Sequence, residues 1–277
     1  MKLHFYGVRG SLPVPSPDTA RYGGNTTCIA ARSDSGDLLI VDAGTGLRLL
    51  GDTLPQEGVC HLFLTHPHID HLLGLPFFAP IYSKGWTLHL HTPPGGQDIL
   101  ERVMDGVLFP VRARDIPARL LITPYGAGTV FQVGGIRAEA VAVPHPGGGH
   151  GLRLSENSWL VALSGDCELP ANVEGTGESG WDAARRLLAG AETAIVDGQC
   201  LREEYASFEG WGHSACEDWL APCAEAGVRR LVFTHHAIGA NDIELNRRER
   251  LLAQASPRSL EVVMAREGLS LTEGSPL

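Results

Sequence analysis

The sequence predicts an α/β protein in which helices and strands form packed layers, and three observations support this. Short apolar runs typical of strands recur along the 277 residues, helical segments lie between several of them, and no repeat of fixed period is present. Since 43% of the residues are hydrophobic, the chain can build one large domain or two small ones around a substantial core. We expect a single domain spanning residues 1–277.

The expected strands share dense runs of Val, Ile, Leu or aromatic residues. They comprise residues 2–6, 38–41, 60–64, 86–90, 136–143, 159–163, 193–196 and 230–233. The expected helices comprise residues 97–104, 181–189, 214–226 and 243–254. The alternation of the two element types along the chain is the reason for the α/β prediction.

The third expected helix carries its own boundary signals. Ser214 and Glu217 have the spacing of a capping box, and Gly227 would end the helix. Pro222 inside the segment should kink the helix or shorten it. Residues 169–180 form the clearest flexible loop, and their position inside the α/β pattern makes them an insertion rather than a domain linker.

Composition and charge narrow the class of protein. The sequence has no run of about 18 apolar residues, and its start lacks the hydrophobic stretch of a secretory signal, so we expect a cytoplasmic protein without a membrane partner. The formal net charge of -10 offers no broad attraction for nucleic acid, which favours a small substrate over a long polyanion. The cysteines include no C-x-x-C pair and are expected to be reduced, mostly buried thiols.

The stretch "LFLTHPHIDHLLGLPFF", residues 62–78, brings four metal-ligand side chains together behind a strand-like run. The intervening proline favours extended backbone, so His66 and His68 can point the same way at the strand end. Asp70 would cap the short apolar segment that follows, and His71 would turn back toward the same space. A polar loop rich in histidine is the alternative, but ordinary loops gain little from bunching these groups, whereas zinc, manganese and iron bind them.

Further histidines and aspartates stand at the ends of other expected strands. His145 and His150 lie in "AVAVPHPGGGHG", Asp166 in "LVALSGDCE", and His235 and His236 in "LVFTHHAIG". Strand ends are where α/β folds place their sites. Each position alone is weak evidence, but their recurrence beside the first cluster indicates a shared metal site.

Two other polar features have competing interpretations. Asp42 in "LIVDAGTGLR" would either orient a ligand imidazole or cap a helix over residues 44–50. A dinucleotide-binding interpretation of the same stretch fails because G-x-G-x-x-G is incomplete. His89 and His91 alternate on one strand, so they share a face, which we expect to be exposed to solvent.

The motif "THPHIDH", followed by His145, Asp166 and His235, resembles the metallo-β-lactamase superfamily of binuclear metal hydrolases. The stretches "GVRGSLP", "RYGGNTTC", "DAGTGL", "GWGHS" and "FTHH" are similar to a branch that contains the tRNA 3′-processing endonucleases (ribonuclease Z) and small phosphodiesterases, including that of the carbon–phosphorus lyase pathway. The resemblance implies a four-layer αββα sandwich, in which two mixed sheets pack face to face with helices outside and metals at one edge.

The resemblance also assigns roles to seven positions, with two divalent ions as cofactors, either zinc or manganese, and iron as a further option. His145 is preferred over His150 because it directly follows a strand, and His235 over His236 by register. One ion would be held by His66, His68 and His145; the second by Asp70, His71 and His235; and Asp166 would bridge them.

His213 in "EGWGHSACEDW" matches a position that acts as proton donor near the leaving group in the ribonuclease Z pattern. The positive end of the expected helix at Ser214 would lower its pKa, while phosphate and hydroxide would raise it. The alternative is a capping-region histidine bonded to backbone. Other residues in matching stretches are assigned only to the rim of the site, as phosphate or structural contacts: Arg9, Tyr22, Asn25 and Arg153.

The resemblance and the residues together predict a metal-dependent hydrolase of a small phosphodiester, such as a cyclic nucleotide. A metal-bridging hydroxide would attack phosphorus, His213 would protonate the departing alkoxide, and Asp70 would both bind metal and orient the nucleophile. One alternative is hydrolysis of a thioester, lactone or β-lactam, against which His213 argues. A second is a tRNA 3′-processing endonuclease, against which the net acidity and the lack of a long basic arm argue.

Residues 97–119 contain four arginines that could select an anionic substrate from a lid or rim, with a solvated face as the alternative. They are Arg102, Arg112, Arg114 and Arg119. The sequence does not decide between a monomer and a homodimer.

Overall fold

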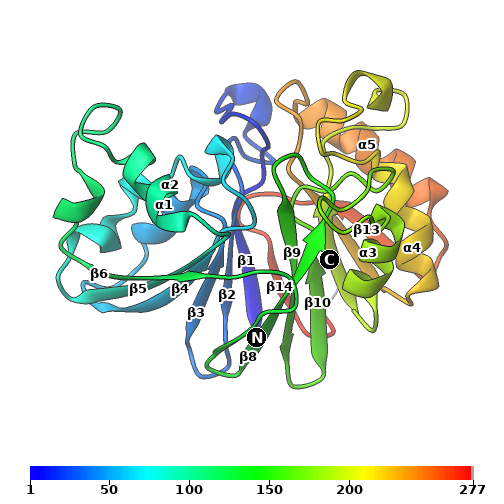
Figure 1. Ribbon diagram of the computed structural model, residues 1–277. Helices are drawn as coiled ribbons and strands as arrows, with labels where there is room; N and C mark the ends of the chain where they lie inside the picture. The colour runs from blue at the N-terminus through cyan, green and yellow to red at the C-terminus, as the bar shows by residue number, and fades with distance from the viewer. Residues whose placement is uncertain (276–277) are drawn as a thin grey trace.

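A computed structural model describes residues 1–275 and arranges them in four layers (Figure 1). Two seven-stranded sheets pack face to face, α1 and α2 cover the outer face of one, and α3, α4 and α5 cover the other. This is the αββα sandwich that the sequence resemblance implied, so the predicted fold class is confirmed.

The first sheet has the strand order β14-β1-β2-β3-β4-β5-β6. Strands β3 to β6 are mutually parallel, whereas β1 pairs antiparallel with both β2 and β14, so the sheet is mixed. Its strands are β1 (Lys2–Gly7), β2 (Cys28–Arg32), β3 (Leu38–Val41), β4 (Gly58–Phe63), β5 (Trp86–Thr92), β6 (Arg119–Pro124) and β14 (Ser270–Thr272).

The second sheet has the order β13-β12-β11-β10-β9-β8-β7. Strands β10 to β13 are parallel, and β7 to β10 form an antiparallel meander. Its strands are β7 (Val130–Val133), β8 (Ile136–Val143), β9 (Gly149–Glu156), β10 (Trp159–Leu163), β11 (Thr193–Asp197), β12 (Arg230–Thr234) and β13 (Glu261–Met264).

Alternation of side chains along the strands produces three buried layers of apolar residues. Phe63 of β4 packs between the sheets, whereas its neighbour Leu62 packs on the opposite face beneath α1 and α2. A third cluster, which includes Trp219, lies beneath the helices of the second sheet. The helices are α1 (Gly46–Gly51), α2 (Gly96–Val103), α3 (Gly180–Leu188), α4 (Leu220–Glu225) and α5 (Asp242–Ala255).

The helix expected over residues 214–226 is wrong in its first part. Ser214 does not cap it, because its hydroxyl donates to the Cys167 carbonyl at 2.6 Å and accepts from the Leu169 amide at 2.9 Å. A 3₁₀ turn (Cys216–Trp219) precedes α4 instead. Pro222 lies in the first turn of α4, where its missing N–H leaves no helical bond unmade, and Gly227 follows the helix with a φ of 75°.

The expectation that His89 and His91 both face solvent is wrong for His91. That ring is buried, packs against Phe131 of β7 with ring centroids 4.2 Å apart, and shares a 2.9 Å hydrogen bond with His61. His91, His61 and His89 form a row of histidines on the first sheet. The second sheet covers the His91 end of this row, and the other two rings are half-buried.

None of the helices within residues 1–275 combines the length and apolar character needed to cross a bilayer.

Candidate metal centre

Strand ends place the candidate ligands at one edge of the sandwich. In the first sheet, parallel strands β3 and β4 lead to Asp42 and to the loop that begins at His66. In the second sheet, β8 leads to His145, β10 to Asp166, and β12 to His235. Because the two sheets face each other, ligands from both halves of the chain meet at this edge.

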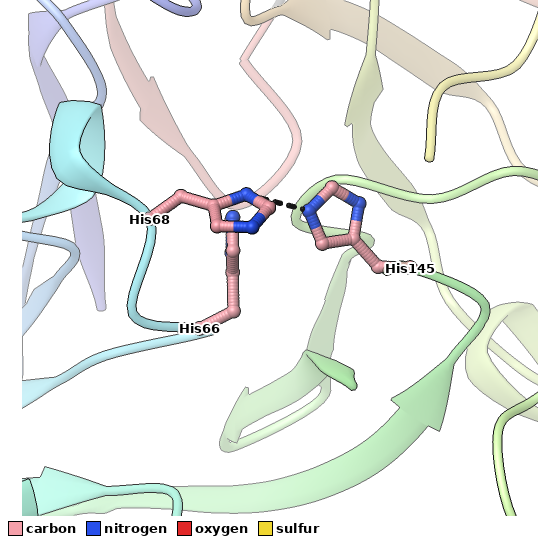
Figure 2. A group of neighbouring side chains, drawn as sticks. All are labelled: His66, His68 and His145. Carbon is pink, nitrogen blue, oxygen red and sulfur yellow. Dashed lines mark hydrogen bonds between the residues drawn. The ribbon is translucent and has the colours of Figure 1, made fainter. Parts of the chain in front are cut away.

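Three histidines form the first group of candidate ligands. His66, His68 and His145 each offer a ring nitrogen within 4.8 Å of the others. Figure 2 shows the three rings pointing toward one another. His68 Nδ1 and His145 Nε2 lie 3.0 Å apart. Burial lowers the pKa of His66 and of His145, so both imidazoles are neutral at pH 7 and can act as ligands.

A second buried group comprises Asp70, His71, Asp166 and His235. The turn Ile69–His71 follows the extended residue His68 and brings two of them together. Asp70 Oδ2 lies 3.4 Å from His71 Nε2 and 3.1 Å from His235 Nε2. Although burial alone would raise the pKa of Asp70, its hydrogen bond with His235 and the neighbouring His71 imidazole hold that pKa well below its usual range.

Asp166 lies between the two groups. Its Oδ2 is 3.6 Å from His66 Nε2 in the first group, and 3.4 Å and 3.2 Å from the Nε2 atoms of His71 and His235 in the second. The side chain is buried, and the charge of the surrounding imidazoles outweighs burial and holds its pKa well below the usual range. A single ionised carboxylate thus faces both groups.

The side chains of the two groups are chemically suited to binding metal ions. Within residues 1–275, the Nε2 atoms of His66 and His71 are buried without a hydrogen-bond partner, which is costly unless another group satisfies them. Both atoms lie beside the ionised carboxylate of Asp166. Imidazole nitrogens and carboxylate oxygens in this arrangement suit zinc, manganese or iron.

Asp42 orients one candidate ligand. Its Oδ2 lies 2.8 Å from His71 Nδ1, and its Oδ1 accepts the Thr65 amide at 2.8 Å. This leaves Nε2 of His71 directed at the carboxylates of the second group. The alternative that Asp42 caps the following helix is wrong, because the residue at the start of α1 is Thr45.

Two glycines allow the rings to approach the backbone. A Cβ on Gly10 would lie 2.2 Å from the His235 ring, and one on Gly212 would lie 2.1 Å from the His145 ring. Neither glycine was singled out from the sequence. In the sequence, these glycines are marked only by their place in the glycine-containing stretches "GVRGSLP" and "GWGHS". Such a stretch does not reveal which histidine ring lies against the backbone.

His213 lies at the edge of the second group. The ring is buried, stacks on His235 with centroids 5.1 Å apart, and places Nδ1 2.8 Å from Asp197 Oδ2. Burial disfavours its protonation, but the Asp197 carboxylate outweighs burial and raises the pKa of His213 to about 9. No helix begins at Ser214, so the expected helix N-terminus beside His213 is absent. The alternative of a backbone-bonded capping histidine is also wrong, because Nδ1 bonds the Asp197 side chain.

Asp197 was missed by the sequence analysis. It ends β11 in "TAIVDG", and the same signal, an acidic residue after an apolar run, drew attention to Asp166. Glu168 was also missed. Its carboxylate accepts hydrogen bonds from the Tyr205 hydroxyl and from the amides of Gly210 and Gly212, which fixes the loop that carries His213.

The residues assigned to the rim make structural contacts. Arg9 is buried and donates to the carbonyls of Gly23 and Ala240. Arg153 donates to carbonyls at the end of α3, including that of Leu187 at 2.7 Å. The remaining two bond to side chains elsewhere in the fold: the Tyr22 hydroxyl to Asn246, and the Asn25 amide to Glu267.

The other histidines at the strand ends point away from the candidate ligands. His150 packs against Tyr125, and His236 Nε2 donates to the Ala265 carbonyl at 2.8 Å. Residues 97–119 span most of α2, which packs beside β6, then the 3₁₀ turn Ala113–Asp115 and the first residue of β6, the edge strand of the first sheet (Figure 1).

Comparison with known proteins agrees with this architecture. Residues 17–236 match the family model described as "Beta-lactamase superfamily domain". Ribonuclease Z of Bradyrhizobium sp. (strain ORS 278) is 23% identical over 244 residues, which cover 72% of this chain and 80% of that protein.

Solved structures share the fold at low sequence identity. The metallo-β-lactamase fold protein YhfI of Bacillus subtilis has a TM-score of 0.74 and 18% identity, covering 98% of both chains. A diphosphatase of the PhnP family has a TM-score of 0.69 and 18% identity, covering 98% of this chain and 97% of its own. Because the matched family model spans residues 17–236, most of the sequence, the chain belongs to the metallo-β-lactamase superfamily of hydrolases.

Proposed function

We propose that the protein is a binuclear metal-dependent phosphodiesterase that hydrolyses a small phosphodiester, such as a cyclic nucleotide. The observation that carries this proposal is the position of Asp166, whose Oδ2 lies within 3.6 Å of imidazoles in both candidate groups. Two cations bound there would lower the pKa of a water and stabilise charge that develops on a phosphoryl centre.

The chain offers a matched ligand set for each ion. Three neutral imidazoles would hold one ion, Asp70 with two imidazoles would hold the other, and Asp166 would bind both. The first set is His66, His68 and His145, and the second is Asp70, His71 and His235. The backbone amide of Ser11 donates to Asp70 Oδ2 at 2.8 Å, which fixes that carboxylate for binding metal and orienting the nucleophile.

His213 would supply the proton for the leaving group. Because Nδ1 is bonded to Asp197, Nε2 is the atom free to carry a proton toward the substrate. Asp197 favours the imidazolium form, whereas nearby cations would oppose it, so the two influences would bring the pKa closer to neutrality. A protonated donor of this kind is needed for a poor alkoxide leaving group and not for an activated carbonyl.

A tRNA 3′-processing activity is the second candidate, and it is supported by the relative named ribonuclease Z. The net charge of -10 opposes it, because binding a long polyanion depends on basic surface. Efficient trimming of a precursor tRNA 3′ end would favour this candidate over the small diester.

The proposed function is tested with His213→Ala on two diesters that differ in leaving group. On an alkyl diester, loss of the acid should reduce turnover by roughly 10²–10⁴-fold, the range of general acid catalysis. On bis(4-nitrophenyl) phosphate the loss should be much smaller, because nitrophenolate departs without a proton. Elemental analysis should find two ions per chain in the variant and in wild type.

His89→Ala is the matched control, since it removes a half-buried histidine that lies outside the centre. Equal losses on both diesters with the metals retained would remove His213 as the acid. At most one ion per chain in reconstituted wild type, or faster hydrolysis of a thioester or lactone than of any diester, would contradict the proposed function itself.

A further inference from the structure

A cavity of about 650 Å³ lies beside the candidate metal centre, and we call it the side cavity. Two of its wall residues adjoin the proposed ligands. Ser11 lines the cavity and donates its amide to Asp70 Oδ2 at 2.8 Å, and Ala237 lies two residues after His235. A substrate whose phosphorus lies at the centre can therefore extend one of its substituents into this cavity.

An exposed aromatic residue forms one wall of the side cavity. Trp211 is 63% exposed although it lies two residues before the buried His213. Its ring meets the edge of Phe208, with centroids 5.7 Å apart and planes at 86°. Gly210 and Gly212 lie on either side of Trp211, and their amides donate to the buried carboxylate of Glu168. These two hydrogen bonds hold the backbone of Trp211 in place. A fixed tryptophan with an open face suits a flat ring.

A buried amide forms a second wall. Gln199 is 96% buried, since its exposed fraction is 4%, and it lies two residues after Asp197, whose Oδ1 accepts its backbone amide at 3.0 Å. In the part of the chain that the structure describes, the side-chain Oε1 of Gln199 has no hydrogen-bond partner. A buried acceptor without a donor marks a place where a ligand N–H or O–H would bind.

The charges around the side cavity are balanced. Arg248 pairs with Glu204 at 2.7 Å and with Glu244 at 2.9 Å, and Arg247 pairs with Glu244 at 2.8 Å. Since each guanidinium already faces a carboxylate, the cavity has no free cation to attract a second phosphate. Its occupant is therefore expected to be neutral.

We propose that the side cavity binds a neutral planar heterocycle of the substrate, of the nucleobase kind, which stacks on Trp211 and donates an N–H to Gln199 Oε1. This inference rests on the proposed function, because it assumes that the phosphodiester lies at the neighbouring centre. It adds that the selected diester is one that carries a base, with Trp211 and Gln199 as the residues that select it.

Binding of nucleosides tests the cavity without any hydrolysis. Adenosine, guanosine, cytidine and thymidine, with ribose as the probe that lacks a base, are titrated into metal-loaded protein by calorimetry. At least one nucleoside should bind where ribose does not, and Trp211→Ala should weaken it by about 5- to 150-fold, the range for one base–aromatic stack. Trp211→Phe should keep most of the affinity, and Gln199→Leu should change the preference among bases.

Leu108→Ala is the control, since Leu108 is 80% exposed in the segment beside β6 and does not line the side cavity. Equal binding of every nucleoside by wild type and Trp211→Ala, or no binding by wild type, would overturn the inference. Nucleoside binding that depends on Trp211, in a protein that hydrolyses no diester, would support the cavity and refute the proposed function.

A kinetic comparison tests the same inference during turnover. Thymidine 5′-(4-nitrophenyl phosphate) and methyl 4-nitrophenyl phosphate share a leaving group, and only the first carries a nucleoside. The ratio of their kcat/KM values should fall in Trp211→Ala through a higher KM for the thymidine ester, and Leu108→Ala should leave it unchanged. An unchanged ratio in Trp211→Ala would count against the inference even when both esters are hydrolysed.

Discussion

At the scale of single residues, Asp42 combines an unusual backbone with a buried contact. Its φ is 62°, a conformation that Asp and Asn tolerate better than other residues with a side chain. The same residue accepts the Thr65 amide and contacts His71 Nδ1. A substitution by Asn therefore changes the chemistry of the carboxylate while it keeps the backbone that the site needs.

We expect Asp42→Asn to weaken metal binding by about 10- to 100-fold, the usual effect of losing the partner of a ligand imidazole. An amide N–H facing Nδ1 of His71 would force that nitrogen to be an acceptor, which places the proton on Nε2 and blocks the ligand lone pair. Competition with a chromophoric chelator measures the affinity. Asp52→Asn, which removes a charge at a 56% exposed position, is the control, and equal affinities in both variants would contradict the expectation.

His91 predicts a pH dependence of stability. Burial, followed by the neighbouring His61 and His89, lowers the pKa of His91 to about 4 from 6.5. Between pH 6.5 and 4 the unfolded chain binds a proton there that the folded chain does not, so the free energy of unfolding falls as the pH falls through this window. At pH 5 the loss attributable to His91 is up to about 2 kcal/mol.

The variant His91→Gln should therefore lose less stability between pH 7 and pH 5 than wild type does. Urea denaturation of metal-free protein at both pH values gives the change in the free energy of unfolding for each protein. Protonation of the proposed metal ligands contributes equally to wild type and variant, so it cancels in the comparison. His89→Gln serves as a control on the same strand face. A pH dependence of His91→Gln as steep as that of wild type would show that His91 does not carry the effect.

At the scale of elements, the sequence identified those strands that contain a dense run of buried apolar residues. Each of the eight expected strands corresponds to an observed one, because a dense apolar run is enough to identify a buried strand. Other strands, such as β13 and β14, were missed, since they depend on pairing with distant partners. The capping box at Ser214 failed for a similar reason, because Cys167 and Leu169 take its hydroxyl.

The loop over residues 205–213 depends on one buried carboxylate. Glu168 is 3% exposed and accepts from the Tyr205 hydroxyl at 2.8 Å and from the amides of Gly210 and Gly212 at 2.7 and 2.9 Å. It lies two residues after Asp166, so one short segment presents a proposed metal ligand and also fixes the loop that carries His213.

We expect Glu168→Gln to loosen this loop while both metals remain bound. Its NH₂ group would face a backbone N–H, and the loss of a charged hydrogen bond should speed hydrogen exchange over residues 205–213 by about 10- to 100-fold. Turnover should fall because His213 is no longer held in place. Exchange mass spectrometry measures the first effect, with Glu174→Gln on the exposed surface as control. Unchanged exchange in the loop would contradict this role.

At the scale of the whole molecule, the ligand motif allowed the four-layer fold to be inferred through a resemblance. Alternating strands and helices predict α/β layers, but they do not reveal that the chain divides into two mixed sheets. The candidate ligands were identifiable because each follows an apolar run, whereas the side cavity was not, since it forms only when residues 11, 199, 211 and 237 come together in space.

Metal should stabilise the entire sandwich, because the proposed ligands come from both sheets. With zinc at about 100 times its dissociation constant, binding should increase the free energy of unfolding by roughly 2.7 kcal/mol. This increase should raise the melting temperature by about 5–10 °C, and EDTA should reverse the rise. Differential scanning fluorimetry measures it. Asp166→Asn should lose most of this response, and an equal shift in that variant would indicate that zinc stabilises the fold from another place.

The distribution of the proposed ligands along the chain has a consequence for synthesis. The first, His66, is translated long before the last, His235, and apart from β14 the strands of the first sheet precede those of the second in the sequence. A nascent chain can therefore present the three-histidine group only after His145 has left the ribosome, and it can close the second group only after His235 has done so. A chain interrupted between His145 and His235 would carry a complete ligand set for only one of the two proposed ions.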